Sequence, residues 1–405
     1  MKTLTLDEIK ALEARHVVQT YKRQPVAFVR GSGSRLYDVD GREYLDLVSG
    51  IGVASLGHAH PGLAAAISEQ ASTLLHTSNL YYHPLQGQVA ARLTQLSGMA
   101  RVFFTNSGTE AVEGCLKFAR RYWYTQGITT RSAFVAIENS FAGRTMGALS
   151  VTWDEHYRAP FQPLLGPVTF VPSGDVAALE AAVTDKTAAI IAEPIQGEGG
   201  IRPLSQEFAQ AITDVCRRTG TLYIADEVQT GLGRTGHPFY FPVLGLQPDL
   251  VSVGKALGSG VPVGAMLMSE RVAQAISPGD HGTTYGGNLL ACRAALFFLE
   301  QLTDKGLLDH VKTVGPLFER RLRTLALKHP VIVETRGVGL MQGLQLAVDA
   351  APIVDAARER GLLVNRTNEK VVRMLPPLTI EAADIDRAME ILDEVLAAVG
   401  AEVHA

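Results

Sequence analysis

The stretch PDLVSVGKALGSGVPVGAM, residues 248–266, decides the fold class because it holds two short apolar runs separated by glycines and a single lysine. Runs 250–253 and 264–268 have the length and composition of strands that are buried on both faces of a sheet. Lys255 lies between them, although lysine is seldom buried without a partner. The lysine is therefore either a side chain that reaches out to water or a group with a chemical role.

Runs of the same kind alternate with helical stretches from about residue 100 onward. One such stretch, 205–220, repeats its apolar residues at helical spacing and ends in Gly220, a residue suited to a helix C-terminus. Continuous apolar strands separated by helices indicate an α/β fold whose mostly parallel sheet is covered by helices on both faces. The predicted sheet has seven strands: 101–105, 134–137, 168–171, 188–194, 221–227, 250–255 and 264–268.

The sequence pattern changes beyond about residue 330. Residues 331–348 and 362–378 each predict two strands, and residues 381–399 predict an amphipathic final helix. Residues 35–47 predict a hairpin around Asp40-Gly41, and we expect this hairpin to pack with the C-terminal unit, a smaller α+β domain. The predicted division of the chain is an N-terminal segment at 1–60, a large domain at 61–300 and a small domain at 301–405.

Composition argues against several classes of protein. The chain has 405 residues, with 37 Lys and Arg against 41 Asp and Glu, a formal net charge of −4 that favours neither nucleic acid nor an anionic membrane. No apolar run approaches the roughly 20 residues needed to cross a bilayer, and the first residues lack the apolar centre of a signal peptide. Three cysteines, Cys115, Cys216 and Cys292, have no metal-ligand spacing and fit a reducing compartment. We expect a soluble cytoplasmic protein that binds no metal, nucleic acid or membrane.

A glycine-bearing turn follows the first predicted strand of the sheet. In NSGTE, residues 106–110, Ser107 and Glu110 have the spacing of a capping box, and Gly108 allows a ligand to approach the backbone. The free N–H groups and the positive dipole at such a helix start suit a phosphate group. The alternative is a well-capped helix without a ligand.

Two charged residues and one aromatic residue follow other predicted strands, at the edge where open parallel sheets bind ligands. Asp226 could hold a ring nitrogen in its protonated form, or it could begin an ordinary turn. Lys255 in a dry pocket would have a lowered pKa and a neutral amine able to condense with a carbonyl. Phe141 could stack on a flat ring or belong to the core.

A phosphate site, a carboxylate and an amine at the strand ends of one sheet are the three groups that pyridoxal phosphate requires. Each signal is weak alone, but the combination predicts a site for this cofactor. The turn at Gly108 would hold the phosphate, Asp226 would keep the pyridine nitrogen charged, and Lys255 would bond to the aldehyde. The ring would then act as an electron sink, with Lys255 and Asp226 as the catalytic residues.

Eight segments, several of which contain the residues named above, resemble those of a known family. They are NSGTEAVEGCLKFAR, FAGRT, EPIQGEGG, ADEVQTGLGRTG, GKALGSGVPVGAM, HGTTYGGN, RGVGLMQGLQL and VRMLPPL. In this order they resemble the motifs of class III (ornithine-type) aminotransferases, and the similarity extends over nearly the whole chain. The resemblance implies the fold type I of pyridoxal-phosphate-dependent transferases and a homodimer whose two active sites lie at the subunit interface. Within the class the sequence is most similar to acetylornithine aminotransferases, including variants that act on acylated or carrier-bound lysine.

The resemblance also implies which residues bind the cofactor. These are Ser107, Gly108 and Thr109 in the phosphate turn, Phe141 and Val228 on the two ring faces, Asp226 at the ring nitrogen, Gln229 beside the ring hydroxyl, Lys255 at the aldehyde, and Thr284 reaching the phosphate from the neighbouring subunit.

Five residues match substrate-binding positions of the family. Arg144 matches an arginine that clamps a substrate carboxylate in bidentate geometry, with a surface ion pair as the alternative. Tyr21 and Thr283 match positions near the substrate. Glu198 and Arg373 match a gate, in which Glu198 neutralises Arg373 until glutamate binds; the alternative is a structural salt bridge.

The choice of substrate depends on Ile51, which stands where ornithine δ-aminotransferases tend to carry a tyrosine. An apolar residue there suits an acylated α-amine better than the charged amine of free ornithine, because an unpaired buried ammonium is costly. The expected reaction moves the terminal amine of N2-acetyl-L-ornithine to 2-oxoglutarate, giving N-acetyl-L-glutamate 5-semialdehyde and L-glutamate in arginine biosynthesis.

Several alternatives stay open at this point. The donor could be acetyl-lysine or carrier-bound lysine in lysine biosynthesis, succinylornithine, or 4-aminobutyrate, whose enzymes also often have isoleucine at the position of Ile51. A pyridoxal-phosphate aminomutase or decarboxylase would use the same fold without an external keto acid. A non-catalytic scaffold would not need Asp226, Gln229 and Lys255 to be intact.

Overall fold

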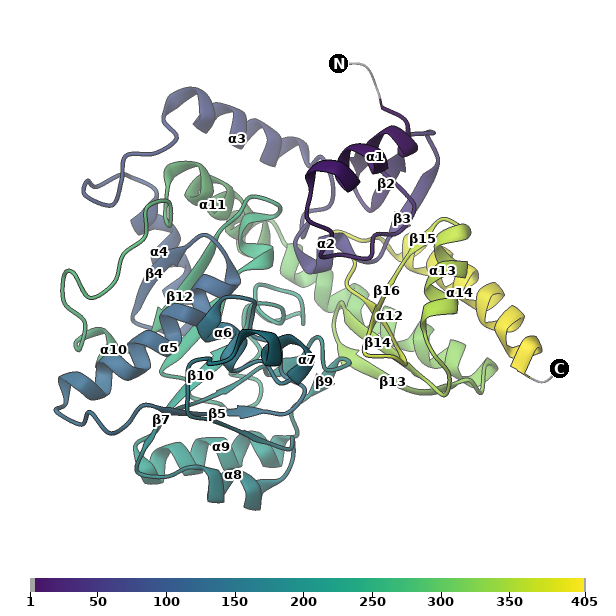
Figure 1. Ribbon diagram of the computed structural model, residues 1–405. Coiled ribbons are helices and arrows are strands. Elements are labelled where there is room, and N and C mark those ends of the chain that lie inside the picture. Colours follow the sequence, from purple (N-terminus) through teal and green to yellow (C-terminus); the bar gives the residue numbers. More distant parts are fainter. Residues whose placement is uncertain (1–3, 404–405) are drawn as a thin grey trace.

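A large central sheet organises the structure, a computed structural model that describes residues 4–403 (Figure 1). Within these residues the sheet has seven strands, in the order β4-β12-β11-β10-β7-β5-β6. Its parallel pairs are β10 with β11, β10 with β7, β5 with β7 and β5 with β6, and β12 is antiparallel to both of its neighbours. This confirms the predicted α/β fold with a mostly parallel seven-stranded sheet. The strands are β4 (Arg101–Thr105), β5 (Ala133–Ile137), β6 (Val168–Val171), β7 (Thr187–Ala192), β10 (Leu222–Asp226), β11 (Leu250–Val253) and β12 (Gly264–Met268).

The direction of β12 follows from the length of the segment before it. Residues 254–263 connect β11 to β12, and this segment is shorter than the dozen or more residues that a parallel crossover requires. The chain therefore turns back beside β11, and β4 pairs on the other side of β12.

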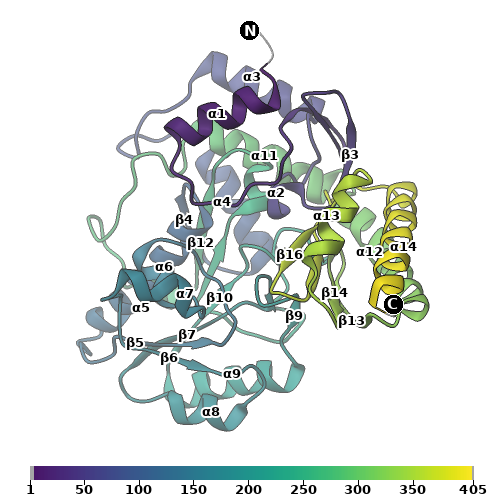
Figure 2. The same ribbon diagram turned by 45° about the vertical axis from the view of Figure 1, so that its right-hand side comes forward.

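Both faces of the central sheet are buried, which explains the continuous apolar strands. Helix α5 (Gly108–Thr125) covers one face, and α9 (Gln206–Thr219) with α8 (Val176–Ala182) covers the other. Along β10, Leu222 and Ile224 join the core beneath α5, whereas Tyr223 and Ala225 join the core beneath α9. Figure 2 shows α8 and α9 together below β6 and β7.

Two four-stranded sheets lie to the right of the central sheet in Figure 1, one at the upper right and one below it. In the first, the predicted hairpin forms around Asp40-Gly41, and a strand from near the C-terminus adds to it in parallel. This sheet therefore connects the N-terminal part of the chain with its C-terminal part. Its strands are β1 (Phe28–Ser32), β2 (Arg35–Asp38), β3 (Glu43–Asp46) and β15 (Leu362–Leu363), in that order.

The second of these sheets is antiparallel and contains both strand pairs predicted near the C-terminus. Helix α12 packs on it, α14 lies beside α12, and α13 lies beside α14. Its order is β13 (Ile332–Val338), β14 (Met341–Leu346), β17 (Val371–Met374) and β16 (Asn365–Thr367), and the helices are α12 (Leu307–Lys328), α13 (Ala351–Glu359) and α14 (Ala382–Val403).

The remaining helices, turns and strands complete the described chain. They are α1 (Leu6–His16), α2 (Ser49–Gly52), α3 (Pro61–Thr73), α4 (Gln86–Ser97), α6 (Met146–Ser150), α7 (Glu155–Arg158), α10 (Glu270–Ala273), α11 (Leu289–Asp304), the 3₁₀ turns η1 (Ala159–Phe161) and η2 (Lys255–Gly258), and the two-stranded pair β8 (Ile195–Gln196) and β9 (Arg202–Pro203). Helix α11 continues through residue 300, and the predicted domain boundaries stay a prediction.

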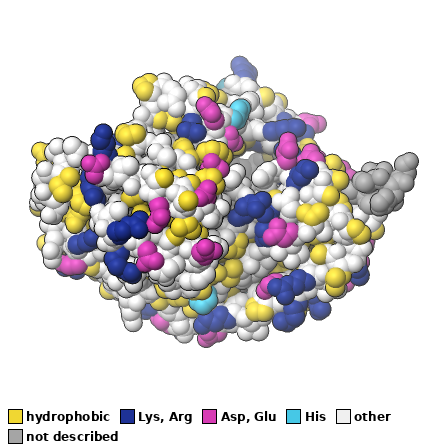
Figure 3. Space-filling model, turned by 90° about the horizontal axis from the view of Figure 1, so that it is seen from below, with side chains coloured by type: hydrophobic (Ala, Val, Ile, Leu, Met, Phe, Trp, Pro, Cys, Tyr) yellow, Lys and Arg dark blue, Asp and Glu magenta, His cyan; other side chains and the backbone are white. Residues whose placement is uncertain are grey.

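Two further observations concern the charges on the surface and the length of the helices. Figure 3 shows side chains of both charges interspersed over the face seen from below, with neither sign dominating. Among residues 4–403, no helix is both long and apolar enough to span a bilayer.

Candidate active site

The central sheet brings a carboxylate and an amine to one edge. Asp226 is the last residue of β10 and lies opposite Ser252 of the parallel neighbour β11. Lys255 follows β11 after a single glycine, Gly254. The start of α5 reaches the same place, since a Cβ added to Gly254 would lie 3.0 Å from the Cα of Gly108. Three of the sequence-predicted groups are therefore neighbours.

The start of α5 has the features of an anion site. Ser107 caps the helix by accepting a hydrogen bond from the backbone N–H of Glu110 at 3.3 Å. Among the described residues, no acceptor receives a hydrogen bond from the N–H of Gly108 or Thr109, so both are free for a ligand. Gly108 cannot be replaced without movement, because an added Cβ would lie 2.6 Å from Cγ1 of Val228.

The predicted capping box is only half formed. Oε2 of Glu110 accepts from the backbone N–H of Asn106 at 2.7 Å and from its Nδ2 at 2.9 Å, rather than from the N–H of Ser107. The glutamate therefore ties down the residue before the cap. The reciprocal part of the prediction was wrong because spacing alone does not distinguish these two neighbouring N–H groups.

Asp226 is buried and keeps one oxygen available. Its Oδ1 accepts from Ser252 Oγ at 3.0 Å and from the N–H of Val228 at 3.1 Å, and no described residue donates to its Oδ2. Burial raises the pKa of Asp226 to about 6, although these hydrogen bonds and the charge of Lys255 oppose the change. A cationic partner at Oδ2 would favour the ionised form.

Lys255 is held in a strained backbone conformation with a φ of 37°, the left-handed region that residues other than glycine seldom occupy. Burial lowers the pKa of its amine to about 8, while the charge of Glu198 acts in the opposite direction. Its Nζ has neither a hydrogen bond nor an ion pair within residues 4–403. Roughly a tenth of this amine would be neutral at pH 7, far more than for an ordinary lysine, which makes it a more competent nucleophile.

Glu198 and Arg373 form an ion pair that connects two sheets of the molecule. Glu198 follows β8, and Arg373 lies on β17 with its side chain buried; the shortest N–O distance between them is 2.5 Å. Burial alone would raise the pKa of Glu198, but the Arg373 and Lys255 cations outweigh it and hold this pKa below its usual range. The structure thus brings together the two residues that the sequence could only match to a gate.

Polar side chains hold this ion pair in place. Arg373 also donates to Asn365 Oδ1 at 3.2 Å and to Gln229 Oε1 at 3.4 Å. Thr367 Oγ1 lies 2.7 Å from the carbonyl oxygen of Glu198, to which it donates, and 3.3 Å from Oε2 of Glu198. Gln229 approaches so closely that a Cβ on Gly197 would lie 2.3 Å from its Oε1, so a side chain at position 197 would displace Gln229.

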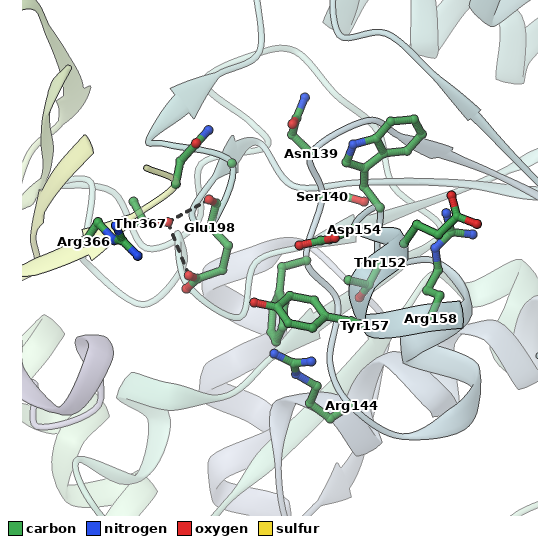
Figure 4. A pocket seen from close by; sticks show the side chains of 15 residues that line it. Asn139, Ser140, Arg144, Thr152, Asp154, Tyr157, Arg158, Glu198, Arg366 and Thr367 are labelled. Atoms are coloured by element: carbon green, nitrogen blue, oxygen red, sulfur yellow. Dashed lines mark hydrogen bonds between the residues drawn. The ribbon is translucent and has the colours of Figure 1, made fainter. Parts of the chain in front are cut away.

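Outside these groups lies a cavity of about 580 Å³ (Figure 4). The guanidinium carbon of Arg144 lies 3.6 Å from the centre of the Tyr157 ring and 5.6 Å from that of Phe141. Figure 4 shows the Tyr157 ring against Arg144, with Glu198 and Thr367 on another wall. No carboxylate among residues 4–403 forms an ion pair with Arg144, so the surface ion pair considered as its alternative role is not formed there. The lining consists of residues 139–141, 144, 152–155, 157–158, 198–199 and 366–368.

Comparison with protein families agrees with this geometry. A family model described as "Aminotransferase class-III" matches residues 17–396. The chain belongs to this family. The class-III aminotransferases depend on pyridoxal phosphate, and the edge of the central sheet offers the three kinds of group that this cofactor needs.

Individual relatives support the assignment. The aminotransferase chain is 46% identical to an acetylornithine aminotransferase of Methanocaldococcus jannaschii, over 95% of this chain and 96% of the relative. A solved ornithine aminotransferase from Toxoplasma gondii, with partial occupancy of pyridoxal phosphate at its active site, is similar with a TM-score of 0.94 and 34% identity, covering 100% and 97% of the two chains. A solved acetylornithine aminotransferase from Elizabethkingia anophelis has a TM-score of 0.86 and 31% identity, covering 98% and 100%.

Three predicted site residues do not line the cavity. Tyr21 is 73% exposed, stacks against Arg23 and does not line the cavity. Thr284 is exposed. Thr283 accepts from Nδ2 of Asn106 at 3.3 Å, so it lies beside the start of α5 in its own chain. The roles predicted for these residues remain predictions that concern a second subunit or a bound substrate.

Two residues that the sequence analysis did not single out belong to the surroundings of the site. Glu193 follows β7, is buried, and accepts from the N–H groups of Phe141 and Gly197, each at 3.0 Å. Burial raises the pKa of Glu193 to about 8, with a further contribution from the charge of Asp226. Tyr157 comes from the short helix α7. For Glu193 a signal existed, because it ends an apolar strand as Asp226 does; for Tyr157 none did.

Proposed function

We propose that this aminotransferase moves the terminal amine of N2-acetyl-L-ornithine to 2-oxoglutarate, giving N-acetyl-L-glutamate 5-semialdehyde and L-glutamate in arginine biosynthesis. The observation that carries the proposal is the contrast between the two arginines near Glu198. Arg144 faces the cavity and forms no ion pair within the described residues, whereas Arg373 is already neutralised by Glu198. Such a site suits a donor with one carboxylate and an uncharged amide, alternating with an acceptor that has two carboxylates. The relatives named acetylornithine aminotransferase, 43–46% identical over nearly the full length, support the same donor.

Pyridoxal phosphate fits the residues at the sheet edge. The N–H groups of Gly108 and Thr109, with the cap at Ser107, would hold its phosphate, and Oδ2 of Asp226 would accept from its ring nitrogen. Lys255 would hold its aldehyde. When bound, the cofactor supplies an electron sink that acidifies the amine-bearing carbon of the substrate.

The remaining cofactor contacts follow from the same packing. Phe141 and Val228 would enclose the two ring faces, and Gln229 would lie beside the ring hydroxyl. Val228 already packs against Gly108, and Gln229 is held by Arg373, so neither side chain needs to move far to reach a ligand at Lys255.

Lys255 has the environment of a proton carrier. Because burial lowers its pKa to about 8, its Nζ can accept a proton near neutral pH and release it again. It would take the proton from the amine-bearing carbon of the donor, and in the second half of the cycle it would return one to the keto carbon of 2-oxoglutarate. Asp226 would remain ionised against the positive ring nitrogen.

The Glu198–Arg373 pair would discriminate between the two half-reactions. With the acylated donor bound, Arg144 would hold its carboxylate, and Glu198 would keep Arg373 from attracting a second one. With 2-oxoglutarate bound, its α-carboxylate would replace Glu198 at Arg373. The partly exposed side chain of Glu198, at 36%, leaves it room to turn away, whereas Arg373 is fixed at 1%.

We further propose a homodimer in the cytoplasm. The apolar side chains of Leu80, Tyr81 and Tyr82 are 84%, 69% and 106% exposed, and Tyr285 is 63% exposed close by, because Asn79 donates to the carbonyl of Gly286 at 3.0 Å. A second copy covering this surface would bury it and could carry Thr284 to the phosphate site of its partner. The unpaired cysteines of the chain fit a reducing compartment.

A half-reaction screen tests the substrate. The enzyme loaded with pyridoxal phosphate is mixed with N-acetylornithine, N-acetyl-lysine, N-succinylornithine, ornithine or 4-aminobutyrate, and the absorbance change to the pyridoxamine form is followed. N-Acetylornithine should convert the enzyme with the highest rate constant per unit concentration. Faster conversion by ornithine or 4-aminobutyrate would refute the proposed donor, and amine migration without 2-oxoglutarate would identify an aminomutase.

A further inference from the structure

One buried carboxylate holds two loops of the site. Glu193 lies just beyond β7, and its two oxygens point in different directions. Oε1 accepts from the N–H of Phe141 and Oε2 accepts from the N–H of Gly197, both at 3.0 Å. The side chain thus connects the loop 138–145 after β5 with the turn 196–199 after β8.

The two segments also contact each other directly. Nε2 of Gln196 donates to the carbonyl of Glu138 at 2.7 Å. A Cβ added to Gly199 would lie 2.6 Å from the carbonyl oxygen of Asn139, so the backbones touch there. Glu193 therefore fixes a packed pair of segments rather than two independent loops.

Each segment carries a charged residue proposed to control the binding of substrate carboxylates. The first carries Arg144, three residues beyond Phe141. The second carries Glu198, one residue beyond Gly197 and paired with Arg373. The relative placement of the free arginine and the paired one thus depends on the hydrogen bonds to Glu193.

We propose that Glu193 is a positioning residue for transamination, which sets the separation between Arg144 and the Glu198–Arg373 pair and thereby the affinity for both substrates. It acts through two backbone N–H groups and does not touch the substrate. The inference rests on the proposed roles of Arg144 and Arg373 in carboxylate binding.

Glu227 offers a matched control. It is also buried at the end of a central strand, and it accepts from the N–H groups of Tyr240 and Phe241 at 2.6 Å each and from Thr230 Oγ1 at 2.6 Å. Its partners lie in segments that do not line the cavity. Loss of either carboxylate should therefore cost stability, but only one loss should alter substrate binding.

The experiment compares Glu193→Gln with Glu227→Gln as full-length enzyme loaded with pyridoxal phosphate. A glutamine at position 193 can accept at only one end and presents an N–H at the other, so one of the two backbone N–H groups loses its acceptor. Glu193→Gln should raise KM for both the amino donor and 2-oxoglutarate by about tenfold or more, with kcat changed less. Glu227→Gln keeps an acceptor at the position of Oε1, to which both of its backbone N–H partners donate, and should leave both KM values within about twofold of wild type.

A second variant covers the case in which Glu193→Gln fails to fold. Gly199→Ala leaves Glu193 intact but pushes on the carbonyl of Asn139, so it should separate the same two segments and raise both KM values. The donor used is whichever one the wild-type enzyme converts fastest, so an error in the proposed substrate is detected separately. Unchanged KM values in a folded Glu193→Gln, or in Gly199→Ala if the former does not fold, would overturn the inference.

Discussion

The carboxyl edge of the central sheet and the outer cavity are constructed in different ways. At the edge, Asp226 and Lys255 lie at the ends of adjacent strands, and their separation is set by the parallel register of β10 and β11. In the cavity, Arg144 and Glu198 lie on loops, and Arg373 comes from a different sheet. The contrast suggests that rigid strand ends hold the chemistry, whereas loops and a neighbouring sheet adjust the recognition of substrates.

The largest effect should come from the edge. Lys255→Ala removes the amine that would hold the cofactor and carry the proton, and turnover should fall by more than about 10³-fold. Steady-state transamination measures this change, with Lys186→Ala, an exposed lysine, expected to behave as wild type. Full turnover in Lys255→Ala would remove the distinction between edge and cavity.

A smaller loss should follow from Asp226→Asn. The amide keeps the shape and the hydrogen bonds at Oδ1 but cannot stabilise a positive ring nitrogen, so kcat should fall by about 10²-fold or more. Ser252→Ala removes only the hydroxyl that donates to Asp226 and should cost far less. Equal losses in the two variants would indicate a structural role for the carboxylate.

The cavity should respond in KM instead of kcat. Arg144→Ala removes a charge-assisted bidentate contact worth roughly 2–3 kcal/mol, so KM for the donor should rise about 30- to 150-fold. Arg158→Ala, which removes another arginine lining the same cavity, should cause a smaller rise. If kcat fell instead while KM stayed constant, Arg144 would belong functionally to the edge.

The pH dependence of cofactor attachment sharpens the comparison. Burial lowers the pKa of Lys255 to about 8, and only the neutral amine attacks an aldehyde, so reaction must become slower as pH falls below that value. The second-order rate constant for loading the apoenzyme should drop about fivefold from pH 8 to pH 7 and approach a plateau above pH 9. Stopped-flow absorbance with pyridoxal phosphate provides the measurement. A rate that keeps rising tenfold per unit to pH 10 would mean an amine with its ordinary pKa.

The smallest effect is expected at Tyr157, which orients Arg144 through its ring. Loss of the stacking should cost about 0.5–1 kcal/mol, so Tyr157→Ala should raise KM for the donor about two- to fivefold. Tyr157→Phe keeps the ring and should leave KM unchanged. A large effect of the phenylalanine variant would instead point to a direct contact of the hydroxyl with substrate.

The same contrast explains what the sequence could reveal. The strand ends carry local signals: apolar runs of the right length followed by Asp226, Lys255 and the turn at Gly108. All seven strands of the central sheet were predicted within two residues of their observed ends, because each run is bounded by polar or glycine residues. The alternation of strands and helices does not specify that β12 is antiparallel. That direction depends on the short connection before β12.

The cavity could be predicted only in part. Arg144, Glu198 and Arg373 were recognised through resemblance to a family, since Glu198 and Arg373 are far apart in sequence and their ion pair depends on how two sheets pack. Glu193 was missed because its partners are backbone N–H groups, which leave no trace in side-chain composition. Tyr157 was missed because α7 is too short for a recognisable period.

Covalent trapping tests the central claim most directly. The loaded enzyme is reduced with borohydride and digested, and the modified peptide is identified by mass spectrometry. The account predicts about one phosphopyridoxyl group per chain, attached to Nζ of Lys255 at the end of β11. A label on another lysine, or no label at all in folded enzyme, would contradict the assignment of the sheet edge as the place where the cofactor is held.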